Sequence, residues 1–409
     1  MTQQIVIIGA GECGGRAALS LRDRGFEGSI TLIGSEPLAP YERPPLSKDA
    51  ILFAAEPKFV AEVDGFASLA IDLRLGVSAA HIDRSRRVVS LSDGTFVPYD
   101  KLLLATGARP RALPAMTSLN GRVRTLRSHA DAMDIRSCLG PGQRVAIIGG
   151  GFIGLELAAS ARKLGTSVTL IEGLPRILSR GVPAEIAAAV ASRHRAEGVE
   201  ILCDARIDKV EQTEDGVQVL LEDGSRIRAD LVVVGIGSTP NTELAAEAGL
   251  AIDNGIAVDS HLQTSDPDIY AAGDCCSFPA AHYGGRHIRL ESWRSAQEQG
   301  LLAAANMMGA QESGAAVPWF WSDQYDLTLQ VAGLAEGATA TVRRDLAAEA
   351  FILFHLAGDG RLLAASGIGP GNTISRDIRL AEMLIASAKT IDAAALAAPA
   401  TKLKALLAA

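Results

Sequence analysis

The sequence predicts an α/β fold in which one strand, glycine turn and helix unit is used twice. Glycine motifs of the pattern G-x-G-x-x-G stand at residues 9–14 and at residues 149–154. Each motif follows a short apolar run, at residues 5–8 and 144–148, and precedes a helical pattern. In both copies the next strand ends at a carboxylate. A unit of this kind is typical of a parallel sheet that is covered by helices.

The remaining elements follow in the order that two such units require. We expect helices over residues 17–24 and 153–164, and strands over residues 29–33 and 167–171. After each strand–helix–strand unit, the sequence predicts a β-hairpin with an Asp-Gly turn. A buried apolar strand that ends in glycine then follows each hairpin. These hairpins and closing runs are expected at residues 88–99, 102–107, 217–227 and 231–237.

This internal repeat predicts two related Rossmann-like nucleotide domains, the second inserted in the first, an arrangement that is similar to glutathione reductase. The first domain would contain residues 1–110 and 240–317, and the second would contain residues 111–239. From residue 318 the pattern changes to short amphipathic strands and an Ala-rich helical tail. We therefore expect residues 318–409 to form a C-terminal α+β domain.

The composition indicates a globular protein of the cytoplasm. The chain has 409 residues, 48% of them hydrophobic and 21% charged, with a net charge of −8. These values disfavour nucleic acid and anionic membranes as partners. Residues 1–4 lead directly into the first apolar run, and the apolar runs are too short to cross a bilayer. The five cysteines are an odd number, which suits free thiols in a reducing compartment.

The two glycine motifs predict dinucleotide binding. The first glycine makes a tight turn, the second lets the backbone approach a pyrophosphate, and the third lets the helix pack closely. The helix N-terminus then holds the anion. Two motifs predict two dinucleotides, and the familiar pairing is a flavin dinucleotide that accepts a hydride from a nicotinamide one. The cofactor-binding candidates from the motifs and the glycine-ended strands are Gly9, Gly11, Cys13, Gly14, Thr106, Gly107, Gly149, Gly151, Gly154 and Gly237.

A carboxylate at the end of the second strand of each unit is a candidate ligand of a ribose. These residues are Glu36 and Glu172. A carboxylate at this place accepts hydrogen bonds from a ribose 2′-hydroxyl and repels a 2′-phosphate, so Glu172 favours NADH over NADPH. The alternative is an exposed carboxylate at a strand end. Arg176 and Arg180 lie nearby in the sequence, so NADPH remains an alternative hydride donor.

Two other segments carry charged candidates. In residues 40–48, Arg43 offers a planar group suited to a pyrophosphate or adenine, and Lys48 is suited to tuning a flavin ring. The alternative is a rigid surface turn with two solvated cations. In residues 269–274 a strand leads to Asp274, which suits the ribityl hydroxyls of a flavin or a helix N-cap, two roles that can coexist.

The cysteines and histidines exclude two kinds of chemistry. Disulfide reductases of this general architecture carry a C-x4-C pair on the first helix, whereas this chain has Cys13 alone there. A vicinal disulfide between Cys275 and Cys276 would strain the peptide, so we expect buried free thiols. The seven histidines show no ligand spacing, and we expect no metal.

Together these motifs resemble the oxygenase-coupled, FAD-dependent NADH:ferredoxin reductases. This is the family of putidaredoxin reductase and of the reductases of aromatic-ring dioxygenase systems. The similarity covers nearly the whole chain. The matching segments are residues 41–48, 104–107, 149–156, 272–274 and 318–324.

The resemblance implies that FAD binds at the first glycine motif and NADH at the second. It implies further FAD contacts from Ser35, Glu36, Arg43, Lys48, Ala79, Arg127, Gly273, Asp274 and Trp293. Relatives often carry an acid at the position of Ser35, so we expect Glu36 to bind the ribose of FAD. The resemblance also places Phe152, Ile153 and Glu156 beside the nicotinamide, and Glu172 and Arg180 at the adenosine half of NADH. Glu156 is expected to pair with Lys48, and these two are the catalytic candidates.

The function implied is transfer of electrons from NADH through FAD, one at a time, to a [2Fe-2S] ferredoxin. That ferredoxin would serve an oxygenase, either a Rieske dioxygenase or a cytochrome P450. One alternative is a rubredoxin reductase or an NADH oxidase like apoptosis-inducing factor. Another is a flavin-bound interaction protein that senses NADH. Trp319 and Trp321 are expected either near the flavin edge or in the core of the C-terminal domain.

Overall fold

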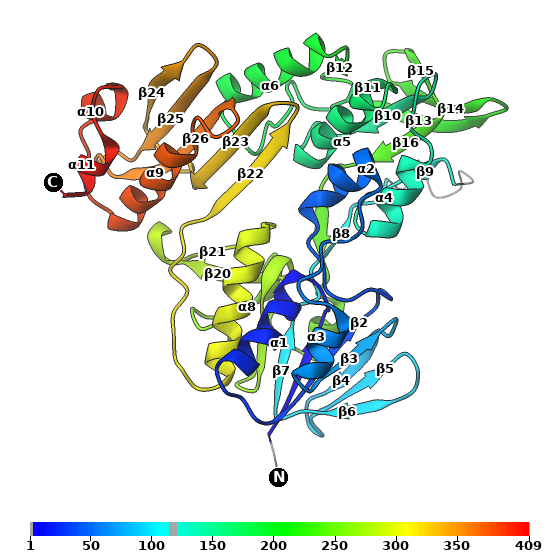
Figure 1. The fold of residues 1–409 in the computed structure, drawn as a ribbon, viewed down its shortest axis with the longest axis vertical. Helices are drawn as coiled ribbons and strands as arrows, with labels where there is room; N and C mark the ends of the chain where they lie inside the picture. The colour runs from blue at the N-terminus through cyan, green and yellow to red at the C-terminus, as the bar shows by residue number, and fades with distance from the viewer. Residues whose placement is uncertain (1–2, 114–120, 409) are drawn as a thin grey trace. The chain divides into compact units, whose positions relative to one another are not determined.

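The computed structural model describes residues 3–113 and 121–408, and the chain divides into two compact units (Figure 1). Unit 1 consists of Met1–Arg43, Pro57–Arg109 and Thr239–Pro318. Unit 2 consists of Pro44–Glu56, Pro110–Ser238 and Trp319–Ala409. The chain changes unit after Arg43, Glu56, Arg109, Ser238 and Pro318, and the third and fourth of these points lie in the short strands β8 (Ala108–Pro110) and β17 (Ser238–Pro240).

A parallel sheet of five strands forms the centre of unit 1, in the order β19-β7-β1-β2-β3. Its strands are β1 (Gln4–Ile8), β2 (Ser29–Gly34), β3 (Ile71–Leu75), β7 (Lys101–Leu104) and β19 (Ile269–Ala271). The central strand β1 pairs in parallel with β2 and β7. Its residues 5–7 are at most 1% exposed, which explains why the strand is apolar without alternation.

The helix α1 (Glu12–Asp23) follows β1, and it begins five residues before the start expected from the sequence. That expectation was wrong because the helix begins immediately after Gly11, within the glycine motif itself. Its first amides therefore lie at the glycine turn. The helix packs against α8 (Trp293–Met307), and a Cβ on Gly300 of α8 would lie 2.5 Å from the Cys13 oxygen.

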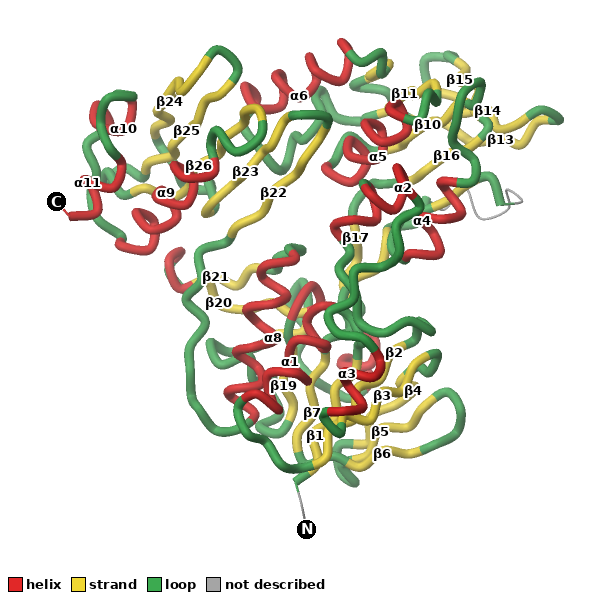
Figure 2. The backbone as a smooth tube through the Cα atoms, viewed as in Figure 1, coloured by secondary structure: helices red, strands yellow, loops and turns green. Residues whose placement is uncertain are grey.

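Smaller elements complete unit 1, as the tube in Figure 2 shows. An antiparallel sheet contains β4 (Ala79–Asp83), β5 (Val88–Leu91) and β6 (Phe96–Pro98). A second small sheet contains β18 (Ile256–Ala257), β20 (Cys276–Ala280) and β21 (Arg286–Ile288). The short helices are α3 (Val63–Ser68) and α7 (Glu243–Glu247).

Unit 2 repeats the arrangement of unit 1. Its parallel sheet has the order β12-β11-β10-β16-β9, with β10 (Arg144–Ile148), β11 (Ser167–Ile171), β12 (Glu200–Leu202), β16 (Leu231–Val234) and β9 (Val123–Arg124). An antiparallel sheet again follows, with β13 (Ile207–Thr213), β14 (Gly216–Leu221) and β15 (Arg226–Ala229). The helices are α2 (Asp49–Phe53), α4 (His129–Arg136), α5 (Phe152–Lys163) and α6 (Ala184–Ala196).

The rest of unit 2 is an antiparallel sheet with a helical tail. The order is β22-β23-β26-β25-β24, with β22 (Trp319–Gln324), β23 (Leu327–Gly333), β24 (Ala340–Ala347), β25 (Ala350–Leu356) and β26 (Leu362–Pro370). The helix α9 (Ser375–Ser387) packs on β26 and β23 and is followed by α10 (Ala393–Ala397) and α11 (Leu403–Ala408). The predicted class, two Rossmann-like domains and a C-terminal α+β domain, is confirmed. The predicted domain boundaries stay a prediction.

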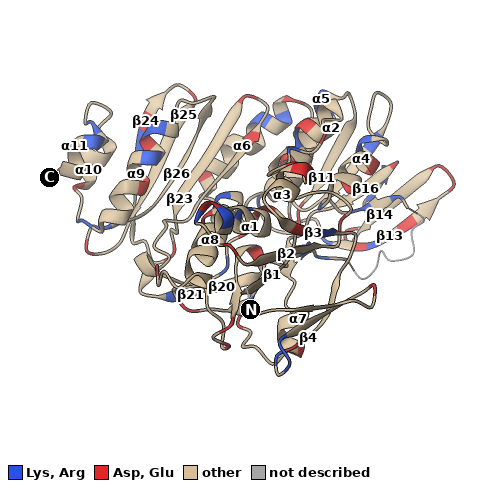
Figure 3. Ribbon diagram, turned by 60° about the horizontal axis from the view of Figure 1, so that its bottom comes forward, with Lys and Arg blue, Asp and Glu red and all other residues tan. Residues whose placement is uncertain are grey.

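The charged residues of both units are mixed in sign. Figure 3 shows Lys and Arg interspersed with Asp and Glu along the helices and the strand edges. Within residues 3–113 and 121–408, no helix combines the length and the hydropathy that crossing a membrane requires.

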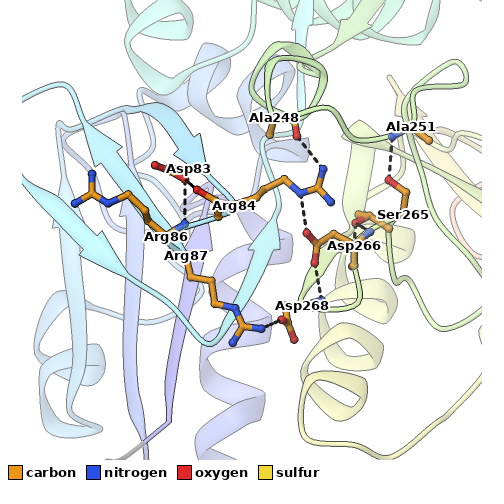
Figure 4. A network of polar contacts seen from close by, with 11 residues as sticks. Asp83, Arg84, Arg86, Arg87, Ala248, Ala251, Ser265, Asp266 and Asp268 are labelled. Atoms are coloured by element: carbon orange, nitrogen blue, oxygen red, sulfur yellow. Dashed lines mark hydrogen bonds and ion pairs between the residues drawn. The ribbon is translucent and has the colours of Figure 1, made fainter.

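A network of polar contacts joins the turn after β4 to the loop before β19 in unit 1 (Figure 4). The Arg84 Nε donates to Asp266 Oδ2 at 2.7 Å, and its Nη1 donates to the Ala248 oxygen at 3.1 Å. Arg87 forms an ion pair with Asp268, whose amide donates to Asp266 Oδ1 at 3.0 Å. The network thus ties the small antiparallel sheet to the loop that leads into β19.

We expect Arg84→Met to lower the free energy of unfolding by about 1–3 kcal/mol, because it leaves the Asp266 carboxylate without its charged donor. Burial raises the pKa of Asp266, but hydrogen bonds from the Asp268 amide and from Arg84 outweigh burial and lower it. The stabilisation that ionised Asp266 contributes is therefore complete above its pKa in the unfolded chain, about 3.9. It is lost as the pH falls through the lower pKa of Asp266 in the folded protein.

Denaturant unfolding at pH 7 and at successively lower pH measures this difference. Arg86→Met is the matched control, because Arg86 is exposed in the same turn and should change stability by less than about 0.5 kcal/mol. An equal effect of the two substitutions, or a difference that grows in acid, would contradict the role of the network.

Candidate functional site

The first glycine motif forms a turn that only glycine fits at two of its three positions. A Cβ on Gly9 would lie 2.0 Å from the Ala105 oxygen, and the φ of Gly9 is +116°. A Cβ on Gly14 would lie 2.0 Å from the Gly9 oxygen. A Cβ on Gly11 would instead meet no atom within 4 Å. The backbone at Gly11 therefore borders open space at the start of α1, where a pyrophosphate fits.

The second motif has the same geometry on the sheet of unit 2. A Cβ on Gly149 would lie 2.4 Å from the Gly235 oxygen, and a Cβ on Gly154 would lie 2.3 Å from the Gly149 oxygen. A Cβ on Gly151 would meet nothing within 4 Å. The residues of both turns therefore fit a dinucleotide, with close packing where the helix meets the strand and open space where the anion would bind.

Glu36 in unit 1 lies at the end of β2 and has two polar partners. The Tyr41 hydroxyl donates to Glu36 Oε2 at 2.5 Å, and the Arg43 Nη2 donates to Glu36 Oε1 at 2.6 Å. Burial lowers the pKa of Arg43, but the neighbouring Tyr41 and Glu36 outweigh burial and raise it. Arg43 is therefore an anchored, half-buried cation, and a freely solvated turn does not describe it.

Glu172 in unit 2 lies at the end of β11 and contacts its own glycine turn. The Gly150 amide donates to Glu172 Oε2 at 2.7 Å, and the Leu174 amide donates to Oε1 at 2.9 Å. These bonds hold the carboxylate beside the second motif, where a ribose would lie. Arg180 is exposed in the loop that follows β11.

Asp274 lies beside the first glycine motif. It belongs to a short turn, Gly273–Cys275, whose N-cap residue is Ala272, so the N-cap alternative for Asp274 does not hold. The Gly273 amide donates to Gln299 Oε1 at 2.7 Å, and a Cβ on Gly273 would lie 3.2 Å from the Cβ of Cys13. The structure thus brings the Gly273–Asp274 turn to the helix α1 that carries the first motif.

Three cysteines at this turn and on the adjacent helix α1 are buried, free thiols. They are Cys13, Cys275 and Cys276, and the expectation of buried free thiols at Cys275 and Cys276 is confirmed. Burial is the largest cause that raises the pKa of each, and for Cys13 the neighbouring Cys275 and Asp274 raise it further. The Cys276 Sγ donates to Gln299 Oε1 at 3.0 Å. None of the three is a ready thiolate nucleophile.

The structure brings the two catalytic candidates together within unit 2. The Lys48 Nζ lies 3.0 Å from Glu156 Oε1, and Glu156 is buried on α5. Two hydroxyls also donate to this carboxylate, Ser47 to Oε2 at 2.5 Å and Ser322 to Oε1 at 2.6 Å. Sequence reasoning missed both serines, although Ser47 directly precedes Lys48 and Ser322 lies within the segment 318–324.

The aromatic residues of β22 lie on opposite faces of the strand. Trp319 and Trp321 are half-buried and stack on one another with ring centroids 5.3 Å apart, and the Lys48 Nζ lies 5.9 Å from the Trp321 ring centroid. Phe320 points the other way and meets Phe152 of α5 edge to face, with centroids 4.9 Å apart. Trp321 thus lies beside the Lys48 ammonium, and both tryptophans lie outside the buried core of the sheet.

The other candidates lie at the ends of elements. Ser35 is exposed after β2, Ala79 opens β4, Trp293 opens α8, and Thr106 Oγ1 donates to the Asn241 oxygen at 2.6 Å. In unit 2 the Arg127 amide donates to Asp131 Oδ2 at 3.0 Å, and Ile153 is 53% exposed at the start of α5.

Two further candidates are glycines with positive φ angles: Gly107 has +67° and Gly237 has +107°, values that favour glycine. In the part of the chain that the structure describes, no three His, Cys, Asp or Glu side chains gather as metal ligands.

Two substitutions separate the roles of the glycines. Gly11→Ala should leave the fold intact but weaken FAD binding at least about tenfold, because its Cβ enters the space of the pyrophosphate. Gly14→Ala should destabilise the fold by about 3 kcal/mol or more, because its Cβ would overlap the Gly9 oxygen. Thermal unfolding of the FAD-free proteins and titration with FAD measure the two effects. Full flavin binding by a folded Gly11→Ala protein would disprove the placement of the pyrophosphate.

Alkylation should distinguish the buried thiols from the others. In the native protein we expect iodoacetamide to modify only Cys138 and Cys203, which are half-buried, and to modify all five cysteines after unfolding. Mass spectrometry of the alkylated peptides identifies the modified sites. The pattern should be the same with and without NADH. Labelling of Cys13 that depends on NADH would reveal a redox thiol and contradict this expectation.

Comparison with known proteins agrees with this geometry. Residues 3–300 match the family model described as pyridine nucleotide-disulphide oxidoreductase, and residues 319–407 match the model described as reductase C-terminal. The chain is 42% identical over 408 residues to the ferredoxin–NAD(+) reductase component of an anthranilate 1,2-dioxygenase system from Burkholderia cepacia, and the match covers 98% of each chain.

Two further similarities concern putidaredoxin reductase. The chain is 42% identical over 373 residues to the enzyme from Pseudomonas putida, covering 89% of this chain and 88% of the other. A crystal structure of the covalent putidaredoxin reductase–putidaredoxin complex matches with a TM-score of 0.94 and 38% identity, covering 99% of this chain and 98% of the other. The chain therefore belongs to the pyridine nucleotide-disulphide oxidoreductase family, among the ferredoxin–NAD(+) reductases.

Proposed function

We propose that this protein is an FAD-dependent reductase that takes electrons from NADH and delivers them singly to a [2Fe-2S] ferredoxin serving an oxygenase. The observation that carries the proposal is the pair of equivalent glycine turns on two parallel sheets, combined with buried thiols at the first of them. Bound FAD supplies the chemistry that converts a two-electron donor into a one-electron donor. The chain's own residues bind, orient and shield the reactants.

The residues of the first turn hold FAD. The start of α1 at Gly11 receives the pyrophosphate, and the Glu36 carboxylate binds the ribose while Arg43 anchors it. Asp274 binds the ribityl chain from the turn that Gln299 fixes. The remaining proposed FAD contacts are Gly9, Cys13, Gly14, Ser35, Lys48, Ala79, Thr106, Gly107, Arg127, Gly273 and Trp293.

The residues of the second turn hold NADH. The start of α5 at Gly151 receives the pyrophosphate, and Glu172 accepts the hydroxyls of the adenosine ribose. A carboxylate at this place repels a 2′-phosphate, which is why we propose NADH and not NADPH as the donor. The exposed Ile153 and its neighbour Phe152 offer apolar surface to the nicotinamide. The remaining proposed contacts are Gly149, Gly154, Glu156, Arg180 and Gly237.

Lys48 and Glu156 act as a fixed charge pair toward the flavin. The ammonium donates to the buried carboxylate at 3.0 Å, so it is held in one orientation. A positioned cation stabilises negative charge that develops on a flavin ring. Transfer of a hydride needs stacking geometry and exclusion of water, so no proton-transferring side chain is required.

Delivery of single electrons to an external protein follows from the burial of the thiols. Cys13, Cys275 and Cys276 are buried with raised pKa values, so they offer no dithiol relay to an acceptor. A [2Fe-2S] ferredoxin accepts one electron at a time and needs no covalent step. The names of the relatives support this partner, since they include a dioxygenase reductase component and putidaredoxin reductase. We propose the cytoplasm as the place of action, because the free thiols suit a reducing compartment.

The decisive measurement is anaerobic stopped-flow absorbance of the purified protein. NADH should bleach the flavin absorbance within milliseconds to seconds, and cytochrome c should be reduced only when a [2Fe-2S] ferredoxin is added. NADPH should react at least about tenfold more slowly.

Other outcomes contradict the proposal. Reduction of rubredoxin in place of ferredoxin would indicate a rubredoxin reductase, and rapid reduction of oxygen would indicate an NADH oxidase. Slow bleaching with dimerisation linked to NADH would indicate an interaction protein that senses NADH. A colourless protein that cannot be reconstituted with FAD would exclude a flavoprotein.

A further inference from the structure

A line of hydrogen-bonded side chains runs from Glu156 into the C-terminal part of unit 2. The Ser322 hydroxyl donates to Glu156 Oε1 at 2.6 Å, and Gln324 Nε2 donates to Ser322 Oγ at 3.0 Å. Gln324 Oε1 lies 2.8 Å from His194 Nε2, and the Tyr325 hydroxyl lies 3.4 Å from His194 Nδ1. The line thus joins α5, β22 and α6.

The donor and the acceptor of each hydrogen bond in this line can be assigned by starting from the Glu156 carboxylate. Glu156 as a carboxylate only accepts, so the Ser322 hydroxyl must donate to it and must itself accept from the Gln324 amide. The Gln324 oxygen then faces His194 Nε2, which must carry a hydrogen. His194 Nδ1 is left as an acceptor for the Tyr325 hydroxyl. All donors point toward Glu156.

The protonation of His194 agrees with this direction. His194 is fully buried, and burial lowers its pKa in spite of the hydrogen bond to Gln324. A neutral ring with its hydrogen on Nε2 satisfies both neighbours, because it donates to the Gln324 oxygen and accepts from the Tyr325 hydroxyl. Two charged groups act on His194: Glu197 raises its pKa and Arg193 lowers it, and Arg193 pairs with Glu197 at 2.9 Å and with Asp326 at 3.0 Å.

The backbone of β22 and its turn supports the same arrangement. Ser322 and Gln324 are both buried because strand alternation places them on one face, while Trp321 and Asp323 lie on the other. Tyr325 begins the turn with a φ of +60°, a conformation that is unfavourable for a bulky side chain. Its ring meets His194 edge to face, with centroids 5.0 Å apart. A strained turn thus places Tyr325 on the histidine.

We propose that Ser322, Gln324 and His194 are positioning residues that fix the Glu156 carboxylate, and through it the Lys48 ammonium. Because Gln324 is an amide, the line orients and polarises its members and does not carry a proton along its length. The C-terminal part of the chain would thereby set the charge pair that acts on the flavin. This inference rests on the function proposed above.

The first test asks for the tautomer of His194, and it does not depend on catalysis. In ¹⁵N-labelled holoenzyme, the ring should be neutral with hydrogen on Nε2, and Gln324→Met should alter the Nε2 resonance. His355 is the internal reference, since it is also buried in unit 2 but contacts Thr341. A His194 ring with hydrogen on Nδ1 only would overturn the proposed direction.

The second test measures the flavin midpoint potential and the rate of flavin reduction at saturating NADH. Ser322→Ala should shift the potential and slow reduction about tenfold with little change in KM, because one charge-assisted donor is lost. Ser322→Thr keeps the hydroxyl and should restore most of the rate. His194→Phe should shift the potential in the same direction by a smaller amount.

The double variant shows whether the residues act as one line. If they do, His194→Phe should add no further shift in a Ser322→Ala background, since the link to Glu156 is already cut. His355→Phe and Ser366→Ala replace buried residues of the same sheet outside the line and should leave the potential unchanged. Additive shifts, or loss of thermal stability without any shift in potential, would overturn the proposal.

Failure of this inference is separable from failure of the proposed function. If the unmodified protein binds no FAD or is not reduced by NADH, the proposed function is wrong. If it is reduced normally and the Ser322 and His194 variants match it in potential and rate, only the positioning line is wrong.

Discussion

The close approach of helix backbone to strand backbone at the two glycine motifs is the constraint on which the rest of the structure depends. The 2.0 Å that would separate a Cβ on Gly14 from the Gly9 oxygen leaves no room for any side chain, and Gly154 repeats this in unit 2. Because each helix starts inside its motif, its free amides lie at the end of a buried strand. The sheet, the helix and the anion site are therefore one feature, and its presence in both units links the fold to two dinucleotides.

Most of the fold that could be predicted from the sequence follows from patterns within short stretches of residues. The central parallel strands have apolar interiors and hairpins alternate, so the strand at Val88–Leu91 and the repeated βαβ units follow from short windows of residues. The start of α1 was misplaced because Glu12 to Arg16 carry little apolar periodicity. Only the glycine turn, which ends at Gly11, marks that boundary.

The contacts of the candidate site were less predictable because they join distant parts of the chain. Ser47 and Ser322 reach Glu156 across 109 and 166 residues, and His194 reaches Gln324 across 130. A lone histidine in a helix or a serine in a strand gives no local sign of such a partner. The pairing of Lys48 with Glu156 was expected only through resemblance to a family, since no spacing rule connects two residues so far apart.

Two features bear on how this chain handles electrons: shielded thiols in unit 1 and a held cation in unit 2. A thiol relay would need accessible, ionised sulfur, and burial works against ionisation at all three cysteines near the first turn. The Lys48 ammonium is instead held in place by a carboxylate that also accepts two hydroxyl donors. A fixed charge changes the energy of electrons on a neighbouring ring without forming a bond. Shielded thiols disfavour storing electrons in a disulfide, which is the chemical distinction between this chain and the disulfide reductases that share its fold.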